Sequence, residues 1–238
     1  MDIARIGRAL ATVAFAALFP IAALAADSAP LKIGIIGSGR IGGTLGELWA
    51  KAGHQVMFSS LDLEHDKELA KTVGGNAQAG TPAQAAAWGE VLLVSVPYTA
   101  LPQVGKDYAA SIKGKVVLDT SNPIESRDGA MAVAAREKGT GVASAEFLPG
   151  ARLVRAFNGV GYRSLRSESN RAGDKVAIPL AADDKQALEV AIRLVKDAGF
   201  EPVVVGGLET AKKFDVGTPV FGKALTAAEL RHGLGIAK

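Results

Sequence analysis

The sequence contains no cysteine and only three histidines among its 238 residues. The absence of cysteine excludes disulfide bonds, thiolate metal ligands and a cysteine nucleophile. His54, His65 and His232 lie far apart and in none of the spacings that bind a metal ion. His54 follows a glycine and precedes an apolar run, so we expect it to lead into a strand rather than to bind a ligand. Polar chemistry in this chain must therefore come from other side chains or from a cofactor.

A large excess of charge of one sign is also lacking. The 27 lysines and arginines nearly balance the 24 acidic residues, which leaves a net charge of +3 with no long run of one sign. A nucleic-acid-binding surface or a polybasic membrane surface is therefore not expected. The rest of the composition, 48% hydrophobic and 21% charged, is that of an ordinary globular protein that can bury one substantial core.

The N-terminal segment predicts export. Arg5 and Arg8 precede an uncharged, largely apolar segment over residues 9–22, and Ala23-Leu-Ala25 matches a small-x-small cleavage site. We therefore expect a signal peptide over residues 1–25, a short linker over residues 26–31, and a periplasmic mature protein without stable membrane insertion. The alternative is an uncleaved N-terminal anchor, for which the apolar segment is short.

The most informative pattern begins at Lys32, where small and branched apolar residues lead into Gly37-Ser38-Gly39-Arg40-Ile41-Gly42. This G-x-G-x-x-G loop between a strand and a helix is typical of dinucleotide binding. Gly37 allows the tight turn, Gly39 removes a side chain that would block a phosphate, and Gly42 lets the helix lie close to the strand. We expect the free amides of the first helical turn to face the pyrophosphate.

Strand and helix patterns alternate from this loop to near the C-terminus. Apolar runs typical of strands follow at residues 56–58, 77–79, 91–96, 115–119, 152–157, 175–181 and 202–205. No repeat or low-complexity tract marks a second domain. The sequence thus predicts an α/β fold with a doubly wound, mostly parallel, Rossmann-like sheet of about eight strands. The single domain spans residues 32–225, with a polar loop from residue 158 to residue 174 and a C-terminal tail at residues 226–238.

The end of the second strand indicates which dinucleotide binds. In NAD-binding domains an acidic residue here accepts hydrogen bonds from the ribose, but this sequence has Ser59 and Ser60. Hydroxyl groups and turn amides can hold a 2′-phosphate that a carboxylate would repel, which favours NADP. Arg40 is either a further partner of that phosphate or a solvated residue at the helix start. If the second strand ends later, Asp62 supplies the acidic residue that NAD-binding domains have at this place, so NAD remains the alternative.

Further motifs resemble one enzyme family. Besides the glycine loop they are Ala79-Gly-Thr-Pro-Ala-Gln-Ala85, Val94-Ser-Val-Pro97, Asp119-Thr-Ser-Asn-Pro123, Leu153-Val-Arg-Ala-Phe-Asn158, Ala198-Gly-Phe-Glu-Pro-Val203 and Gly207-Leu-Glu-Thr-Ala211. In this order they resemble the coenzyme F420-dependent NADP reductase family, from Lys32 to about Phe221. The resemblance implies a compact Rossmann protein, forming a homodimer, in which nicotinamide lies against a flavin or deazaflavin for hydride transfer.

Carried over by position, the resemblance also implies site residues. Residues 38–42 would contact the pyrophosphate and Ser60 the 2′-phosphate. The contacts to ribose and nicotinamide would come from Val96, Pro97, Tyr98, Asn122 and Asn158. Hydride transfer between two rings needs no protein nucleophile, so Tyr98, Asn122 and Asn158 are candidates only for the nicotinamide side. Family members commonly have an arginine after the second-strand serine, where this chain has Leu61.

The sequence therefore predicts an NADP(H)-dependent oxidoreductase that transfers hydride between nicotinamide and a flavin, F420 or another small-molecule cosubstrate. One alternative is an exported, non-enzymatic dinucleotide-binding or interaction module, which the N-terminal segment and Leu61 favour. The other is a dehydrogenase or imine reductase acting on a small substrate. Such enzymes usually add a long helical C-terminal domain, and few residues follow the last predicted strand here.

Overall fold

The structure is a computed structural model that describes residues 29–236. The predicted signal peptide and the first part of the predicted linker lie outside these residues. Among the helices of residues 29–236, none is long and apolar enough to cross a bilayer.

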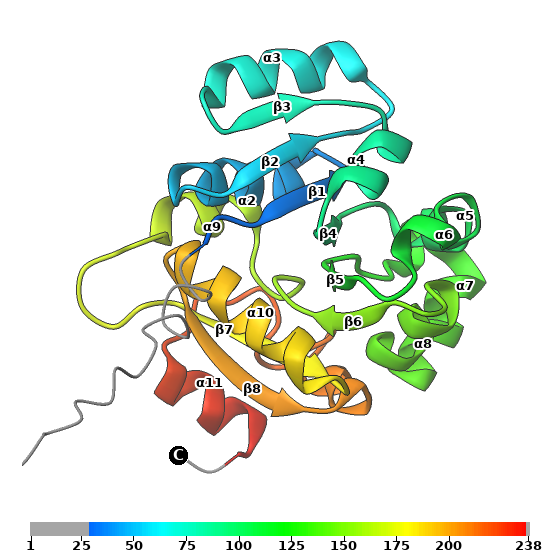
Figure 1. The fold of residues 1–238 in the computed structure, drawn as a ribbon. Helices are drawn as coiled ribbons and strands as arrows, with labels where there is room; N and C mark the ends of the chain where they lie inside the picture. The colour runs from blue at the N-terminus through cyan, green and yellow to red at the C-terminus, as the bar shows by residue number, and fades with distance from the viewer. Residues whose placement is uncertain (1–28, 237–238) are drawn as a thin grey trace, which may run out of the picture.

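Eight strands form one twisted sheet in the order β3-β2-β1-β4-β5-β6-β7-β8 (Figure 1). The strands are β1 (Lys32–Ile36), β2 (Gln55–Phe58), β3 (Ala77–Ala79), β4 (Val91–Val94), β5 (Val116–Asp119), β6 (Arg152–Arg155), β7 (Ala177–Ala182) and β8 (Glu201–Gly206). Neighbouring strands from β3 to β6 pair in parallel, β7 is antiparallel to β6, and β8 is parallel to β7. This order confirms the predicted doubly wound, mostly parallel sheet of a Rossmann-like domain.

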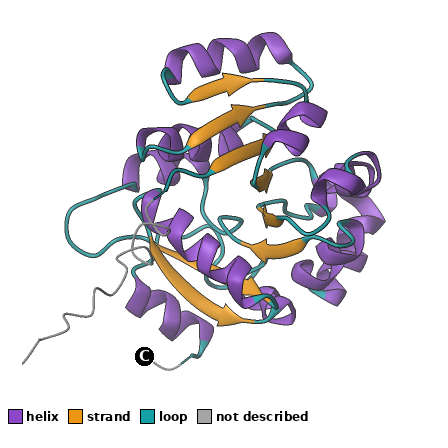
Figure 2. Cartoon of the chain, in the orientation of Figure 1, coloured by secondary structure: helices purple, strands orange, loops and turns teal. Residues whose placement is uncertain are grey.

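Helices cover both faces of the sheet (Figure 2). One face carries α2 (Arg40–Lys51), α3 (Leu63–Val73), α9 (Tyr162–Glu168) and α10 (Lys185–Asp197). The other carries α4 (Pro82–Trp88), the short 3-10 helix η1 (Tyr98–Ala100), α5 (Leu101–Asp107), α6 (Ala109–Ile112), α7 (Glu125–Lys138) and α8 (Thr140–Phe147). The central strands are consequently buried on both faces, which is why they are nearly continuous apolar runs in the sequence.

Side chains that alternate along a strand join different cores. On β5, Leu118 packs with the α2 and α10 face, whereas Val117 packs with the α5 and α8 face. The indole N–H of Trp49 in α2 donates to the carbonyl oxygen of Leu194 in α10 at 2.8 Å. Since this bond joins two helices distant in sequence, it fixes how α2, the helix behind the glycine loop, lies on the sheet.

Two segments that the sequence predicts to be irregular contain helices. The expected polar loop after β6 includes α9, which is held to the core by the buried side chain of Leu165 and begins without a side-chain cap. The expected C-terminal tail includes α11 (Ala227–Leu234), which packs beside β8 (Figure 1). Thr226 and Glu229 form a capping box at its start, and Leu230 and Leu234 are buried.

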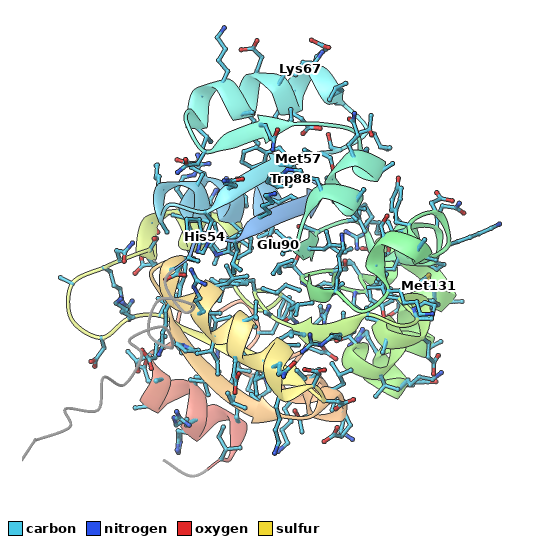
Figure 3. The ribbon with its side chains drawn as sticks, viewed as in Figure 1. His54, Met57, Lys67, Trp88, Glu90 and Met131 are labelled. Carbon is cyan, nitrogen blue, oxygen red and sulfur yellow. The ribbon has the colours of Figure 1, made fainter. Side chains whose placement is uncertain are left out.

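His54, labelled in Figure 3, leads into β2 at the amino-terminal edge of the sheet. The backbone N–H of Leu31 donates to its Nδ1 at 3.1 Å, and its Nε2 lies 3.0 Å from an Asp197 carboxylate oxygen. Burial lowers the pKa of His54, and the hydrogen bond with Asp197 opposes this shift. The histidine therefore joins the start of the sheet to α10, as expected from its place before the strand.

Candidate functional site

The glycine loop between β1 and α2 has the backbone that its three glycines predict. Gly37 has a positive φ of 102°, and a Cβ there would overlap the carbonyl oxygen of Ser95. At Gly42 a Cβ would overlap the carbonyl oxygen of Gly37, so only glycine lets α2 pack this closely on the loop. Both positions are therefore closed to larger residues by the protein's own backbone.

The third glycine, Gly39, faces open space. A Cβ at this position would meet nothing within 4 Å, so the fold itself does not require a glycine here. Among residues 29–236, the amides of Arg40, Ile41 and Gly42 donate to no backbone or side-chain acceptor. These three N–H groups begin a 12-residue helix, where the helix dipole favours an anion. The loop therefore fits a pyrophosphate group.

The end of β2 holds the glycine loop in place. The amides of Gly37 and Ser38 donate to the carbonyl oxygen of Ser59 at 2.8 and 3.0 Å, and the Ser38 hydroxyl donates to the same oxygen at 3.0 Å. Ser59 is fully buried and its own hydroxyl donates to the carbonyl oxygen of Ile35. The hydroxyl groups of Ser38 and Ser59 are therefore both buried and bound inside the protein, which corrects the expectation that the Ser59 hydroxyl helps to hold a 2′-phosphate.

The segment after β4 divides into exposed and buried residues. Val96 is half-buried beside Gly37, and Pro97 is exposed. Tyr98 is fully buried, and its hydroxyl lies 3.3 Å from the Ser144 hydroxyl in α8. Burial raises the pKa of Tyr98 to about 12. The side chain of Tyr98 belongs to the core, which corrects its expected position against the nicotinamide.

Asn122 and Asn158 meet where β5 and β6 end. The side-chain Nδ2 of Asn122 donates to the backbone carbonyl oxygen of Asn158 at 2.7 Å, and the Asn158 side-chain nitrogen lies 3.4 Å from Asn122 Oδ1. Asn158 is buried, and its Oδ1 has no hydrogen-bond partner among the described residues. An unpaired buried acceptor is costly unless a ligand or water satisfies it. The structure therefore brings together two residues that are 36 positions apart, and their role at the nicotinamide stays a prediction.

The preceding residue, Phe157, is in an unusual conformation. Its φ of 59° is rare for a bulky residue, and its ring is buried in edge contacts with Trp49 and Phe200. Backbone strain of this kind persists where the surrounding packing enforces it. The turn at Phe157 places one side chain in the core and the next, that of Asn158, beside Asn122.

A buried ion pair lies beneath these loops. The Arg155 guanidinium donates to an Asp119 carboxylate oxygen at 2.5 Å and to the Asp119 carbonyl oxygen at 3.1 Å. A carboxylate oxygen of Asp215 lies 3.9 Å from the same guanidinium and also binds Thr140. Asp119 Oδ1 accepts the Ser121 amide at 2.8 Å. The pair thus connects the ends of β5 and β6 to the loop that carries Asn122.

The loops enclose a cavity of about 240 Å³ above the ends of β5 and β6. Its lining includes Ile41 of α2, the two asparagines, the start of α9 and the C-terminal residues Phe221 and Gly222. The Gly222 amide donates to the Gly159 carbonyl oxygen at 2.8 Å, which fixes the C-terminal segment over the site. Sequence reasoning missed Phe221 and Gly222. The glycines and proline of residues 217–222 indicate a turn there but not where the turn lies.

Three further residues follow β2 or begin α2: Ser60, Leu61 and Arg40. Ser60 is half-buried, and its hydroxyl donates to an Asp66 carboxylate oxygen at 2.9 Å. Leu61 is fully exposed. The Arg40 guanidinium stacks over the Tyr162 ring, 5.2 Å from its centroid, on the α9 side of the loop.

The fold and the glycine loop together define a dinucleotide-binding protein of the Rossmann class. Residues 32–123 match the family described as NADP oxidoreductase, coenzyme F420-dependent. The F420-dependent NADP reductase of Methanothermobacter thermautotrophicus is 31% identical to this chain over 204 residues, which are 80% of this chain and 87% of that reductase. The chain therefore belongs to the coenzyme F420-dependent NADP oxidoreductase family, and it is an oxidoreductase. This finding confirms the predicted family.

Solved structures share the fold at lower sequence identity. A protein from Sinorhizobium meliloti superposes with a TM-score of 0.71 at 22% identity, covering 86% of this chain and 98% of its own. An imine reductase from Myxococcus stipitatus superposes with a TM-score of 0.57 at 16% identity, covering 79% of this chain but only 58% of its own. The imine reductase is therefore longer than the shared fold.

Proposed function

We propose that this protein transfers a hydride between NADP(H) and a flavin-like ring, with the deazaflavin coenzyme F420 or a flavin as the small-molecule cosubstrate. The observation that carries the proposal is the row of free amides at Arg40, Ile41 and Gly42 beside a partly enclosed cavity that ends on Asn158. Family membership supports both the nucleotide and the cosubstrate.

The residues of the chain bind the nucleotide and position its nicotinamide ring. The amides at the start of α2 would hold the pyrophosphate, and the half-buried Val96 lies beside Gly37 of the same loop. Asn122 and Asn158 present amide groups to the nicotinamide end. When bound, the nicotinamide and the flavin-like ring would supply the hydride chemistry between them, so the protein needs no nucleophile of its own. Its remaining contribution is to align the two rings and to exclude water.

The direct test mixes the purified protein with NADPH and either oxidised F420 or a flavin and follows the loss of nicotinamide absorbance. Turnover with one of these acceptors is expected. Binding of NADPH without turnover on either acceptor would instead favour the non-enzymatic module, and turnover only with a small carbonyl or imine would favour the dehydrogenase alternative.

Replacing Asn158 with alanine tests the nicotinamide end. We expect kcat to fall by about tenfold while the Kd for NADPH changes by less than about threefold, because pyrophosphate binding does not involve this side chain. Asn76→Ala is a matched control, since Asn76 binds a backbone carbonyl near the opposite edge of the sheet and should leave both values unchanged. An unchanged kcat in Asn158→Ala would remove this residue from the site.

We also propose export of the protein and a homodimer in solution. The pattern of residues 5–25 supports export, and N-terminal sequencing of the native protein is expected to begin after Ala25. A native protein that retains Met1 would contradict it. The family resemblance supports the dimer, which sedimentation measurements check.

A further inference from the structure

We propose that Asp66 lowers the affinity of this enzyme for the 2′-phosphate of NADP(H), so that the protein uses NADH as well as NADPH. This inference rests on the proposed function, because it concerns the ribose end of the same nucleotide site. In Rossmann domains the residues at the end of the second strand contact the ribose or its phosphate. In this chain Ser60 stands at that place, two residues after the end of β2.

The Ser60 hydroxyl is held by Asp66. It donates to Asp66 Oδ2 at 2.9 Å, and it accepts the Asp62 amide at 3.1 Å. Asp66 is fully buried in the first turns of α3, and its Oδ1 has no partner among the described residues. A buried carboxylate with an unpaired oxygen therefore lies directly behind the ribose position.

This arrangement determines which ligand groups Ser60 can bind. A hydroxyl has one hydrogen to donate, and its nearest acceptor here is Asp66 Oδ2 at 2.9 Å, whereas the Asp62 carbonyl oxygen lies at 3.3 Å. Ser60 is left as an acceptor, which suits the 2′-hydroxyl of NADH. A 2′-phosphate has only acceptor oxygens near neutral pH and also meets the negative charge of Asp66 at short range.

Two basic side chains near this position, those of Lys67 and Arg40, contact other groups. Leu61 is fully exposed and brings no charge. Lys67 of α3, the outermost helix at that end of the sheet (Figure 3), pairs with Glu64 at 2.7 Å. Arg40 stacks on Tyr162 on the α9 side. The helix start itself is already capped, because the Asp62 carboxylate accepts the His65 amide at 3.0 Å.

The test is Asp66→Asn, with the Kd of each nucleotide measured by the fluorescence of bound NADPH and NADH rather than by turnover. In the wild type the two Kd values are expected to lie within about tenfold of each other. In the variant the amide can donate to the Ser60 oxygen and free its hydrogen for the phosphate. We expect the Kd for NADPH to fall by at least about fivefold and the Kd for NADH to change by less than about twofold.

Glu68→Gln is the matched control, because it removes the same charge from an exposed position of the same helix. It should leave the ratio of the two Kd values unchanged. An unchanged ratio in Asp66→Asn, or a wild type that binds NADPH more than about 100-fold better than NADH, overturns the inference and leaves the proposed function standing.

Ser60→Ala provides a second measurement if Asp66→Asn does not fold. Removal of the acceptor hydroxyl is expected to raise the Kd for NADH by at least about threefold. A Kd for NADH that does not change overturns the inference. If neither nucleotide binds the folded wild type, the proposed function fails, and the inference fails with it.

Discussion

Gly39→Val is expected to abolish nucleotide binding while leaving the fold and its stability intact. A Cβ at Gly39 meets nothing within 4 Å, and the backbone there, with φ −69° and ψ −156°, is extended and accepts a β-branched residue. The new side chain would stand in the space that the pyrophosphate must reach to contact the amides of α2. We expect the Kd for NADPH to rise at least about 100-fold, with a melting temperature within about 2 °C of the wild type.

The control for this variant is Gly75→Ala. Gly75 lies in the turn before β3, its φ is not positive, and a Cβ there also meets nothing within 4 Å. It should change neither stability nor binding. Calorimetric titration measures the Kd of each variant for NADPH, and a thermal melt measures its melting temperature. Full NADPH affinity in Gly39→Val would show that the nucleotide does not lie on the glycine loop.

Arg155→Met is expected to cause the largest loss of stability. Arg155 and Asp119 are both fully buried, and Asp215 lies nearly as deep in the same cluster. Removal of the one cation leaves two buried carboxylates without a counter-charge. Breaking a buried pair in this way typically costs about 3–5 kcal/mol, because the desolvated partner charge remains. For a domain of this size the melting temperature should then fall by about 6–20 °C.

Two further variants separate the buried charge from the lost packing. Asp119→Asn combined with Arg155→Met removes the main partner charge and should recover part of the stability. Arg152 lies on the same strand as Arg155 and forms a more exposed pair with Asp184, the residue that caps α10. Arg152→Met breaks this pair and should shift the unfolding curve much less. Chemical denaturation of the variants measures these differences. Equal losses in Arg155→Met and Arg152→Met would contradict the role given to the buried pair.

The fold and the glycine loop were predictable because their sequence patterns are local. The loop follows a strand and precedes a helix within a dozen residues, and Gly37 and Gly42 have steric reasons that any chain of this geometry shares. The alternation of strands and helices predicted a doubly wound, mostly parallel sheet, since right-handed crossovers leave few arrangements. The antiparallel β7 and the contact between Asn122 and Asn158 were not predicted, because both depend on which strands become neighbours in the folded sheet.

Other expected site residues depend on contacts that no local pattern reveals. Ser38, Ser59 and Tyr98 stand in motifs that suggest a ligand, yet each has its hydroxyl bound inside the protein. Phe221 and Gly222 line the cavity although they lie more than sixty residues after the asparagines. Helix α9 went unpredicted because a single buried leucine holds it to the core.

The helix N-terminus with bare amides after a buried parallel strand could be inferred from the residues alone, because glycine spacing and hydrophobic period act over a few residues. Which hydroxyls remain for a ligand, and which charge lies behind Ser60, became clear only from the folded chain. Burial and hydrogen-bond partners of a side chain are set by segments that meet only after folding, as Asp66 meets Ser60 and as Gly222 meets Gly159.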